Sequence, residues 1–304
     1  MIPADHPYCG RFAPSPTGPL HFGSLVAATG SYLDARSHHG RWLVRMEDLD
    51  PPREQPGAAD LVLHTLEAFG FEWDGGVMHQ SERSDAYAAA LATLRARGAV
   101  FACACTRREI ADSGLAADGE PVYPGTCRHG IPPGRRARSV RVRVDHQVVE
   151  FEDAVQGTIR QDLGREVGDF VVQRADGFFA YQLAVVVDDA EQGITHVVRG
   201  ADLLGSTARQ IHLQRLLGLT TPQYAHLPAA VNAQGEKLSK QTLARPLEAQ
   251  NAAVALVAAL AFLGQKPPAA LGASTLREVW HWARGHWDIA SVPRARAIPA
   301  PASA

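Results

Sequence analysis

The sequence has few of the features that mark secreted or membrane-spanning proteins. It contains four cysteines in 304 residues, too few for a disulfide framework, so reduced thiols or a metal site are favoured. It has no apolar run of about 18 residues, the length that a membrane span needs. No apolar N-terminal segment resembles a signal peptide. We therefore expect a cytoplasmic protein of bacterial type, without contact to a membrane.

The sequence also lacks an excess of charge of one sign. Its formal net charge is −2, which gives no overall indication of nucleic-acid binding, so any RNA-binding surface must be local. Hydrophobic residues make up 46% of the chain and charged residues 20%, which is typical of globular proteins and sufficient for a large core. The length allows roughly two domains, and no internal repeat is evident.

A proline-rich stretch near the start of the chain separates a predicted strand end, Tyr8–Phe12, from a predicted helix, Leu25–Ala35. Three prolines make the connection a stiff turn. A helix N-terminus offers unpaired N–H groups and a partial positive charge, so phosphate binds there readily. We expect His21 and Ser24, at the helix entrance, to face such a phosphate.

Charged residues follow other predicted strands. Arg41–Met46 reads as a buried strand that ends in Glu47 and further acidic residues, and ligands of open α/β sheets bind at the carboxyl ends of strands. A solvated acidic turn is the alternative. Phe178–Asp189 is a buried apolar run that also ends in carboxylates. Arg199 ends a further strand, where a carboxylate ligand would explain a buried guanidinium.

Apolar periodicity predicts the remaining elements, with Ser84 and Asp85 as helix caps. The predicted helices are Gly57–Phe69, Ser84–Arg97, Thr207–Leu217 and Ser274–Trp287, with a helical stretch from Arg245 to Leu263. We expect a strand and a loop over Ile194–Leu203, and a short strand over Leu227–Val231. The Pro/Ala-rich stretch Pro293–Ala304 is expected to be loose.

Three cysteines are spaced as metal ligands. Cys103 and Cys105 alternate with one alanine, so both thiols face the same side of an extended chain, and Cys127 supplies a third sulfur. Tetrahedral zinc needs a fourth ligand, for which Tyr123, His129 and water are candidates. Spacing alone favours His129. Three unligated thiols are the alternative, and Cys9 is expected to be a small core residue.

Short alternating runs between residues 128 and 174 predict a β-rich insertion. Its most basic part carries Arg135, Arg136, Arg138, Arg141 and Arg143. These arginines can neutralise RNA phosphates, which provides affinity without sequence preference, or they can form an ordinary solvated strand face.

Two motifs, one near the start of the chain and one late in it, together resemble the signatures of a known family. Arg11-Phe-Ala-Pro-Ser-Pro-Thr-Gly-Pro-Leu-His-Phe-Gly-Ser24 resembles the first signature of class I aminoacyl-tRNA synthetases in its glutamyl form. Lys237-Leu-Ser-Lys-Gln241 resembles the second, Lys-Met-Ser-Lys-Ser. The resemblance implies an α/β fold with a doubly wound, Rossmann-like parallel sheet. We accordingly divide the chain into a first catalytic half, a zinc-containing acceptor-stem-type insertion, a second catalytic half and a helical C-terminal region, at residues 1–100, 101–180, 181–244 and 245–304.

The same resemblance assigns roles to individual residues. It makes His21 and Lys240 catalytic. It places L-glutamate on Arg11, Phe12, Ala13, Pro14, Ser15, Glu47, Tyr181 and Arg199. It places ATP on His21, Gly23, Ser24, Asp202, Lys237, Leu238 and Lys240, with Mg²⁺ on the pyrophosphate group, bound mainly by the substrate. Val185 stands where many full-length relatives have a substrate-binding asparagine, so one polar contact to glutamate is missing.

The spacing Cys-x-Cys followed by Tyr-x-x-x-Cys resembles the zinc site of a family of truncated glutamyl-type paralogues, the glutamyl-queuosine tRNA(Asp) synthetases. This resemblance selects Tyr123 as the fourth zinc ligand. Residues 245–304 are also too few for the usual anticodon-binding domain. The family resemblance implies tRNA-independent activation of L-glutamate with ATP. The glutamate is then transferred to queuosine in the anticodon of tRNA(Asp), by a monomer whose acceptor-stem site receives the anticodon stem-loop.

Three other functions compete with this interpretation. A minimal glutamyl-tRNA synthetase would charge a tRNA 3′ end instead. A zinc-containing RNA-binding module with a decayed active site would not need His21, Lys240, Arg11 and Arg199. A nucleotidyltransferase of the His-x-Gly-His superfamily would share the ATP half of the site but would not explain Arg11 and Arg199.

Overall fold

Five short parallel strands form the centre of the fold. The computed structural model describes residues 7–111, 122–145, 147–238 and 244–301. The parallel strands are β1 (Cys9–Phe12), β2 (Arg41–Met46), β3 (Met78–His79), β9 (His196–Gly200) and β10 (Gln223–Leu227). Strand β1 pairs with β2, β2 with β3, and β9 with β10. Strands β1 and β9 meet where the Thr195 N–H donates to the Cys9 carbonyl at 2.9 Å.

The helices that connect these strands leave the sheet in two directions. They are α1 (Phe22–Ser37), α2 (Ala58–Ala68), α3 (Ser84–Ala96), α6 (Tyr181–Glu191) and α7 (Leu204–Leu217). The chain passes from β1 through α1 to β2, whereas it passes from β9 through α7 to β10 on the other side. The strand order therefore reverses between β1 and β9. Open α/β sheets bind ligands at such a reversal, outside the carboxyl ends of the strands.

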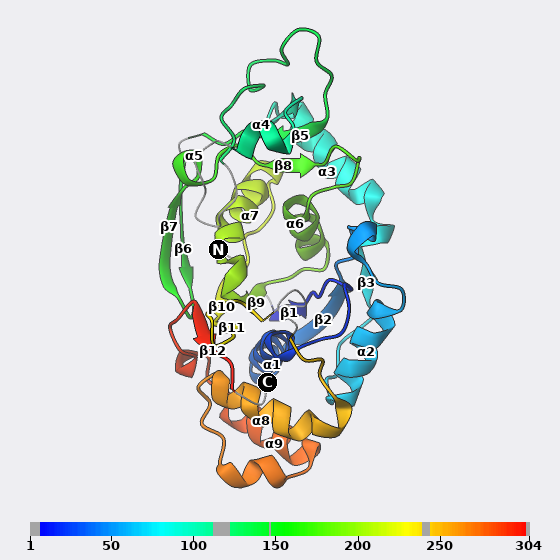
Figure 1. The fold of residues 1–304 in the computed structure, drawn as a ribbon. Coiled ribbons are helices and arrows are strands. Elements are labelled where there is room, and N and C mark those ends of the chain that lie inside the picture. The colour runs from blue at the N-terminus through cyan, green and yellow to red at the C-terminus, as the bar shows by residue number, and fades with distance from the viewer. Residues whose placement is uncertain (1–6, 112–121, 146, 239–243, 302–304) are drawn as a thin grey trace.

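The β-rich insertion is confirmed; most of it lies at one end of the molecule, and one hairpin runs along the side (Figure 1). Its elements are β4 (Val100–Cys103), α4 (Arg107–Ala111), β5 (Ser139–Val142), β6 (Val148–Asp153), β7 (Gly157–Asp162), α5 (Leu163–Glu166) and β8 (Val171–Gln173). Strands β4, β5 and β8 form an antiparallel sheet. The hairpin β6–β7 instead extends the central sheet, because β6 pairs in parallel with β10 at Asp153 and Tyr224.

The C-terminal region covers the opposite end of the molecule (Figure 1). Its elements are α8 (Ala252–Phe262), α9 (Leu276–His286) and β12 (Ala297–Pro299), and β12 lies beside β11 (Ala229–Val231), which precedes this region in the chain. Helix α9 is anchored where the indole N–H of Trp280 donates to the Phe69 carbonyl at 2.8 Å. No helix in the described part of the chain is long and apolar enough to cross a bilayer.

The structure corrects the expectation that Pro293–Ala304 is loose. Within its described part, β12 pairs in parallel with β11. The Arg294 Nε–H also donates to the Gln156 carbonyl at 3.1 Å. Prolines have no backbone N–H, but this short strand pairing needs few such donors. The Ala300 N–H, for example, donates to the Val231 carbonyl at 2.8 Å.

Other predictions were wrong at the ends of helices and in the division of one strand. Neither Ser84 nor Asp85 caps α3; the N-cap is Arg83, whose side chain is instead bonded to Asp188 of α6 at 2.6 Å. The predicted strand Leu227–Val231 is two strands, because Pro228 between β10 and β11 has no N–H to donate. Helix α7 begins at Leu204, before the predicted start, and α8 begins at Ala252, well after it.

Candidate active site

One cavity of about 640 Å³ opens at the carboxyl ends of β1 and β9, where the strand order reverses. This volume lies within the usual range of small-molecule sites. All the residues predicted for glutamate and ATP that the structure describes line it: Arg11, Phe12, Ala13, Pro14, Ser15, His21, Gly23, Ser24, Glu47, Tyr181, Arg199, Asp202, Lys237 and Leu238. Lys240 lies outside the described residues. The cavity therefore brings together segments from both predicted catalytic halves.

A buried ion-pair network lies along one wall of the cavity, where Arg11 and Glu47 line the cavity and Arg45 and Asp189 lie behind them. Asp189 Oδ1 lies 3.2 Å from Arg11 Nε and 2.8 Å from Arg45 Nη2. Arg45 Nη2 is also 3.5 Å from Glu47 Oε1. Burial raises the pKa of Glu47 to about 6, although the Arg45 and Arg11 cations oppose the rise. The Glu47 carboxylate is thus poorly compensated within the protein, and a ligand cation would stabilise its charged form.

Arg199 enters the same cavity from the end of β9. Its Nε–H donates to His226 Nε2 at 3.1 Å, and its Nη2 donates to Thr207 Oγ1 at 2.9 Å. Its Nη1 is buried and finds no hydrogen-bond partner among the described residues. Buried donors are almost always paired, so this nitrogen favours a ligand acceptor in the cavity.

The charges at this end of the cavity favour an anionic amino acid. The guanidinium groups of Arg11, Arg45 and Arg199 face the carboxylates of Glu47 and Asp189. Three positive and two negative groups leave a net charge of +1 when all are ionised. A zwitterionic amino acid with an ionised side-chain carboxylate carries −1 and would balance it.

Helix α6 supplies residues at both of its ends to this wall. Tyr181 begins the helix and lines the cavity, and burial together with Glu47 raises the pKa of its phenol, so the hydroxyl remains a neutral donor. Asp189 lies near the other end. Val185 is fully buried in the core between them and is not among the cavity-lining residues.

The first turn of α1 forms the other end of the cavity. His21 is the N-cap, and its Nδ1 accepts the Ser24 N–H at 3.4 Å. A neutral imidazole that accepts at Nδ1 carries its proton on Nε2, so the ring offers a donor. Lys237 Nζ lies 2.5 Å from Asp202 Oδ2. Gly200 lies close to this pair: a Cβ there would lie 2.3 Å from Asp202 Oδ1, so the Asp202 side chain would have to move.

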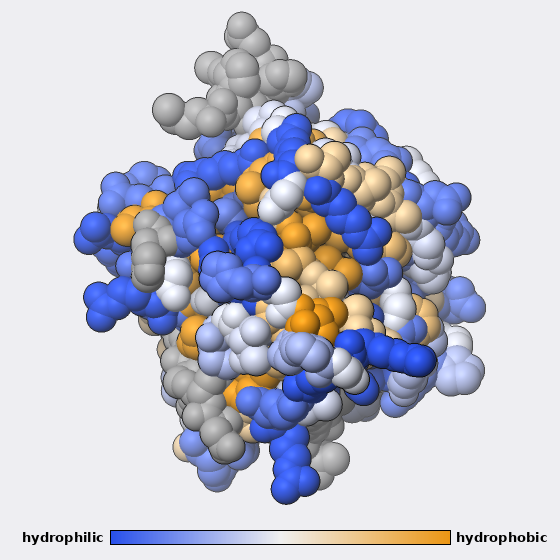
Figure 2. Space-filling model, turned by 90° about the horizontal axis from the view of Figure 1, so that it is seen from above, coloured by the Kyte–Doolittle hydropathy of each residue, from blue (hydrophilic) through white to orange (hydrophobic). Residues whose placement is uncertain are grey.

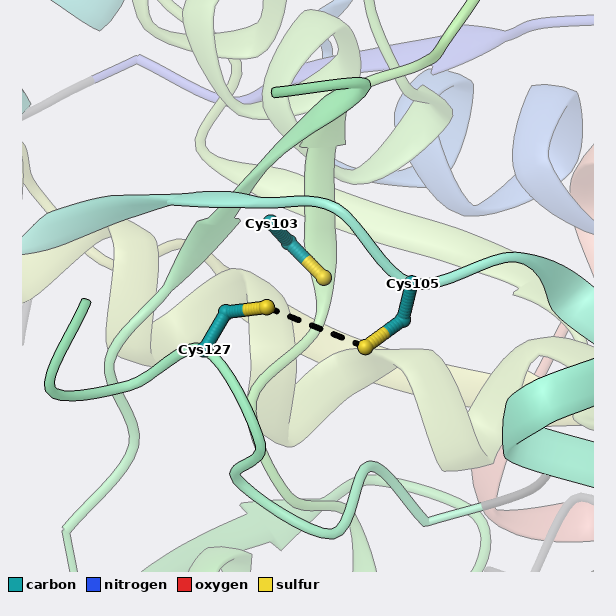
Figure 3. Close-up of side chains that lie close together, drawn as sticks. All are labelled: Cys103, Cys105 and Cys127. Atoms are coloured by element: carbon teal, nitrogen blue, oxygen red, sulfur yellow. Dashed lines mark hydrogen bonds between the residues drawn. The ribbon is translucent and has the colours of Figure 1, made fainter. Parts of the chain in front are cut away.

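The three predicted metal ligands also come together. The sulfur atoms of Cys103, Cys105 and Cys127 all lie within 4.8 Å of one another (Figure 3). The Tyr123 hydroxyl is 3.4 Å from the Cys103 sulfur and 3.6 Å from the Cys105 sulfur. His129 is exposed and does not belong to this cluster. Three soft ligands in this arrangement could hold a metal ion.

The electrostatics of the cluster favour thiolate at Cys103 but not at Cys105, whose pKa is raised by burial. Burial alone would raise the pKa of Cys103, but hydrogen bonding with Tyr123 and the nearby Arg141 cation lower it to about 7. Metal ligation requires the deprotonated sulfur.

Comparison with known proteins decides the family. The model of the catalytic domain of class I tRNA synthetases (E and Q) matches residues 9–270. The chain belongs to this family. It is 64% identical to a Glutamyl-Q tRNA(Asp) synthetase of Aromatoleum aromaticum, over 98% of this chain and 94% of the relative. It is 62% identical to one of Dechloromonas aromatica, over 98% of this chain and all of the relative.

Solved structures support the same fold. The glutamate-tRNA synthetase of Elizabethkingia anophelis matches with a TM-score of 0.79 at 23% identity, over 98% of this chain and 69% of that one. At this identity the match shows the fold alone. The predicted Rossmann-like class I fold is confirmed.

In this class I synthetase, the arginines of the basic segment differ in whether they interact with other groups of the protein. Arg135 is paired with Glu109 at 2.9 Å. Arg141 donates to the Asp169 carbonyl and Arg143 to the Arg128 carbonyl.

Arg136 and Arg138 are exposed, and no ion pair within the described ranges involves them. Figure 2 looks onto this end of the molecule and shows hydrophilic side chains around a smaller hydrophobic area. Of the five arginines of this segment, these two thus make no ion pair with the described part of the protein.

Several residues that shape the synthetase site were missed by sequence reasoning. Arg45 and Arg53 were not singled out, nor were His226 and Asp153, although Arg53 lines the cavity. Arg45 did carry a signal, because a charged residue inside a buried apolar strand needs a partner. The partner, Asp189, lies 144 residues away, and no local pattern connects the two.

Proposed function

We propose that the protein activates L-glutamate with ATP and transfers the glutamate to queuosine in the anticodon of tRNA(Asp). The observation that carries this proposal is the single cavity that joins a buried +1 charge to the N-terminus of α1. Relatives named Glutamyl-Q tRNA(Asp) synthetase, 64% and 62% identical over nearly the whole chain, support the choice of RNA. The enzyme needs no nucleophilic side chain, because the α-carboxylate of glutamate attacks the α-phosphorus of ATP and pyrophosphate leaves.

The amino acid is bound at the charged wall. The Glu47 carboxylate receives the α-ammonium group, and Tyr181 lies beside it. Arg199 Nη1 donates to the γ-carboxylate, with Arg11 adding a second positive charge. Glutamine would place a neutral amide against Arg199 and leave the +1 charge unbalanced, at a cost of about 2–3 kcal/mol.

The ATP phosphates are bound at the other end of the cavity. His21 donates from Nε2, and the first turn of α1 contributes unpaired N–H groups. Lys237 and Lys240 supply positive charge from the second signature, and Mg²⁺ accompanies the pyrophosphate group. Fixed positive groups of this kind stabilise the charge that grows on the phosphoryl oxygens during transfer.

The metal bound by the insertion is zinc, with Cys103, Cys105, Cys127 and Tyr123 as its ligands. Zn–S bonds of about 2.3 Å in a tetrahedron place sulfurs about 3.8 Å apart, and the Cys105 and Cys127 sulfurs are 3.8 Å apart. A Zn–O bond of about 2.0 Å places oxygen about 3.5 Å from sulfur, against 3.4 and 3.6 Å for Tyr123. When bound, zinc would cross-link the two ends of residues 103–127.

The RNA product tests this function against the minimal glutamyl-tRNA synthetase. Purified protein is first assayed for glutamate-dependent exchange of pyrophosphate into ATP without tRNA. Radiolabelled glutamate is then transferred to total tRNA, and the labelled nucleotide is located after nuclease digestion. We expect the label on an anticodon nucleotide of tRNA(Asp), and only in tRNA that carries queuosine. A label on the 3′-terminal adenosine would contradict the proposal and favour aminoacylation, and a lack of exchange without tRNA would contradict the proposed tRNA-independent activation.

A further inference from the structure

The orientation of Arg199 depends on a chain of buried polar groups behind the cavity. His226 on β10 and Thr207 on α7 receive the Nε–H and Nη2–H groups of the guanidinium at 3.1 and 2.9 Å. His226 and Thr207 are both fully buried. With two nitrogens of the guanidinium held from behind, Nη1 is the nitrogen left for a ligand. The position of His226 therefore decides where Arg199 points.

Asp153 determines the tautomer of His226. Its Oδ2 lies 2.5 Å from His226 Nδ1. Its Oδ1 accepts backbone N–H groups from His226 at 3.0 Å, Val155 at 3.1 Å and Gln156 at 2.8 Å. A carboxylate that only accepts requires the proton of the imidazole to be on Nδ1. Nε2 then carries the lone pair that accepts from Arg199, and the Thr207 hydroxyl lies 3.1 Å from the same nitrogen.

The ionisation of His226 is consistent with this arrangement. Burial lowers the pKa of the imidazole to about 4, and the Arg199 cation acts in the same direction, although Asp153 opposes them. The ring is therefore neutral at physiological pH. An imidazolium would instead direct an N–H group against the guanidinium and push Arg199 away.

We infer that Asp153 and His226 are positioning residues that set amino-acid specificity by aiming Arg199 Nη1 at the side-chain carboxylate of the substrate. The inference rests on the proposed function, which supplies glutamate as that substrate. Neither residue is among those that line the cavity, so both act through Arg199. In this role Asp153 resembles a carboxylate that orients a histidine from behind by fixing its tautomer.

The chain of contacts also extends to segments that are far from the site in sequence. Asp153 ends β6 of the inserted hairpin. Gln156, in the following turn, donates to the His226 carbonyl at 2.8 Å and to the Ala295 carbonyl at 3.0 Å. The insertion and the C-terminal segment thereby support the orientation of a residue in the amino-acid pocket.

Asp153→Asn tests the inference, because it is nearly isosteric. Its amide would donate to His226 Nδ1 and move the proton to Nε2, against Arg199. We expect the KM for glutamate in pyrophosphate exchange to rise about 10- to 100-fold. The KM for ATP should remain unchanged, and the preference for glutamate over glutamine should fall. Unchanged KM for glutamate and unchanged preference would overturn the inference.

Two substitutions of His226 separate positioning from folding. His226→Gln retains an acceptor for Arg199 and should keep the KM for glutamate within a few fold of wild type. His226→Asn retains only the donor to Asp153 and should behave like Asp153→Asn. If Asp153→Asn does not fold, the KM values of these two variants for glutamate test the inference instead. Equal effects of both on KM would overturn the inference.

Asp169→Asn is the matched control. Asp169 is a buried carboxylate that accepts from Arg128 at 2.8 Å and from the Val144 N–H at 2.7 Å. Its substitution should lower stability without a change in the KM for glutamate. The two hypotheses are contradicted by different results. If the wild-type protein does not catalyse pyrophosphate exchange, the proposed function is wrong. If the wild type is active and Asp153→Asn has the same KM for glutamate, only the positioning role is wrong.

Discussion

Glu47 keeps its carboxylate in the cavity with 9% of the side chain exposed, and burial raises its pKa from 4.5 to about 6. The pKa of Glu47 is therefore higher in the folded protein than in the unfolded chain. Protonation of Glu47 at low pH thus favours the folded state. That stabilisation is lost as the pH rises through this range. The loss amounts to about 2 kcal/mol in the ligand-free protein.

Glu47→Gln removes this titration. We expect the free energy of unfolding of the variant, relative to wild type, to be about 2 kcal/mol higher at pH 7.5 than at pH 4.5. The KM for glutamate should rise about 10-fold or more, because the α-ammonium loses its charged partner. Urea denaturation at both pH values and pyrophosphate exchange measure the two effects. Glu67→Gln, on the exposed side of α2, should show neither, and a pH-independent difference for Glu47→Gln would contradict the prediction.

Single residues of the site could be predicted from the sequence only where a local motif carries them. Arg11, His21 and Lys237 lie in contiguous signatures, and the structure places all three on the cavity. The pairing of Arg45 with Asp189 and of His226 with Asp153 joins residues 144 and 73 positions apart. Such pairs depend on which strands and helices become neighbours, and one sequence does not contain that information.

At the scale of elements, long periodic segments were predicted better than short ones. The helices α2 and α3 follow their apolar periodicity, because each buries one side (Ala58, Val62 and Leu66 in α2; Tyr87, Leu91 and Leu94 in α3), whereas α1 is buried on most sides. The three-residue strand β12 has too few residues for any alternation to be read, and its pairing with β11 depends on the whole fold. The start of α3 is fixed by the ion pair of Arg83 with Asp188, not by a cap.

The cluster of Cys103, Cys105 and Cys127 joins the end of β4 to a later segment of the chain. If zinc is bound by the three cysteines and Tyr123, purified protein should contain one zinc per chain by elemental analysis. Tyr123→Phe should lose zinc to a chelator faster than wild type and should unfold at a lower temperature. His129→Ala should behave like wild type in both measurements, because His129 is exposed and outside the cluster.

The opposite ranking of these two variants would show that His129 is the fourth ligand. Protein without metal would remove the site altogether. Both readouts are independent of glutamate activation, so a structural metal is distinguished from a catalytic one. Chelation should therefore lower the melting temperature more than it lowers the rate of pyrophosphate exchange measured at 25 °C.

At the scale of the whole molecule, the site depends on two turns, one after β1 and one after β9, that lie close together. The turn after β1 and the turn after β9 open on the same side of the sheet, so His21 and Arg199 share one cavity. The chain after the second signature returns to this place, where the Leu247 N–H donates to the Leu20 carbonyl at 2.9 Å. The family resemblance implied this arrangement, whereas composition and periodicity alone did not.

The net charge of −2 means that the molecule as a whole does not attract RNA, so binding must come from local groups such as Arg136 and Arg138. Each phosphate contact that is lost lowers the slope of log affinity against log salt concentration by about 0.7 to 0.9. The double substitution Arg136→Gln/Arg138→Gln should therefore lower the slope for tRNA binding by about 1.4 to 1.8. Pyrophosphate exchange should not change, because both residues lie outside the cavity-lining set.

Arg95→Gln/Arg277→Gln is the control for this measurement, since it removes the same charge from two exposed positions on α3 and α9. If binding were governed by total charge, both double variants would weaken tRNA affinity equally, with equal slopes. If the insertion binds the RNA, only the first variant alters the slope. Fluorescence anisotropy of labelled tRNA over a series of salt concentrations distinguishes the two cases, and equal slopes would exclude Arg136 and Arg138 as phosphate contacts.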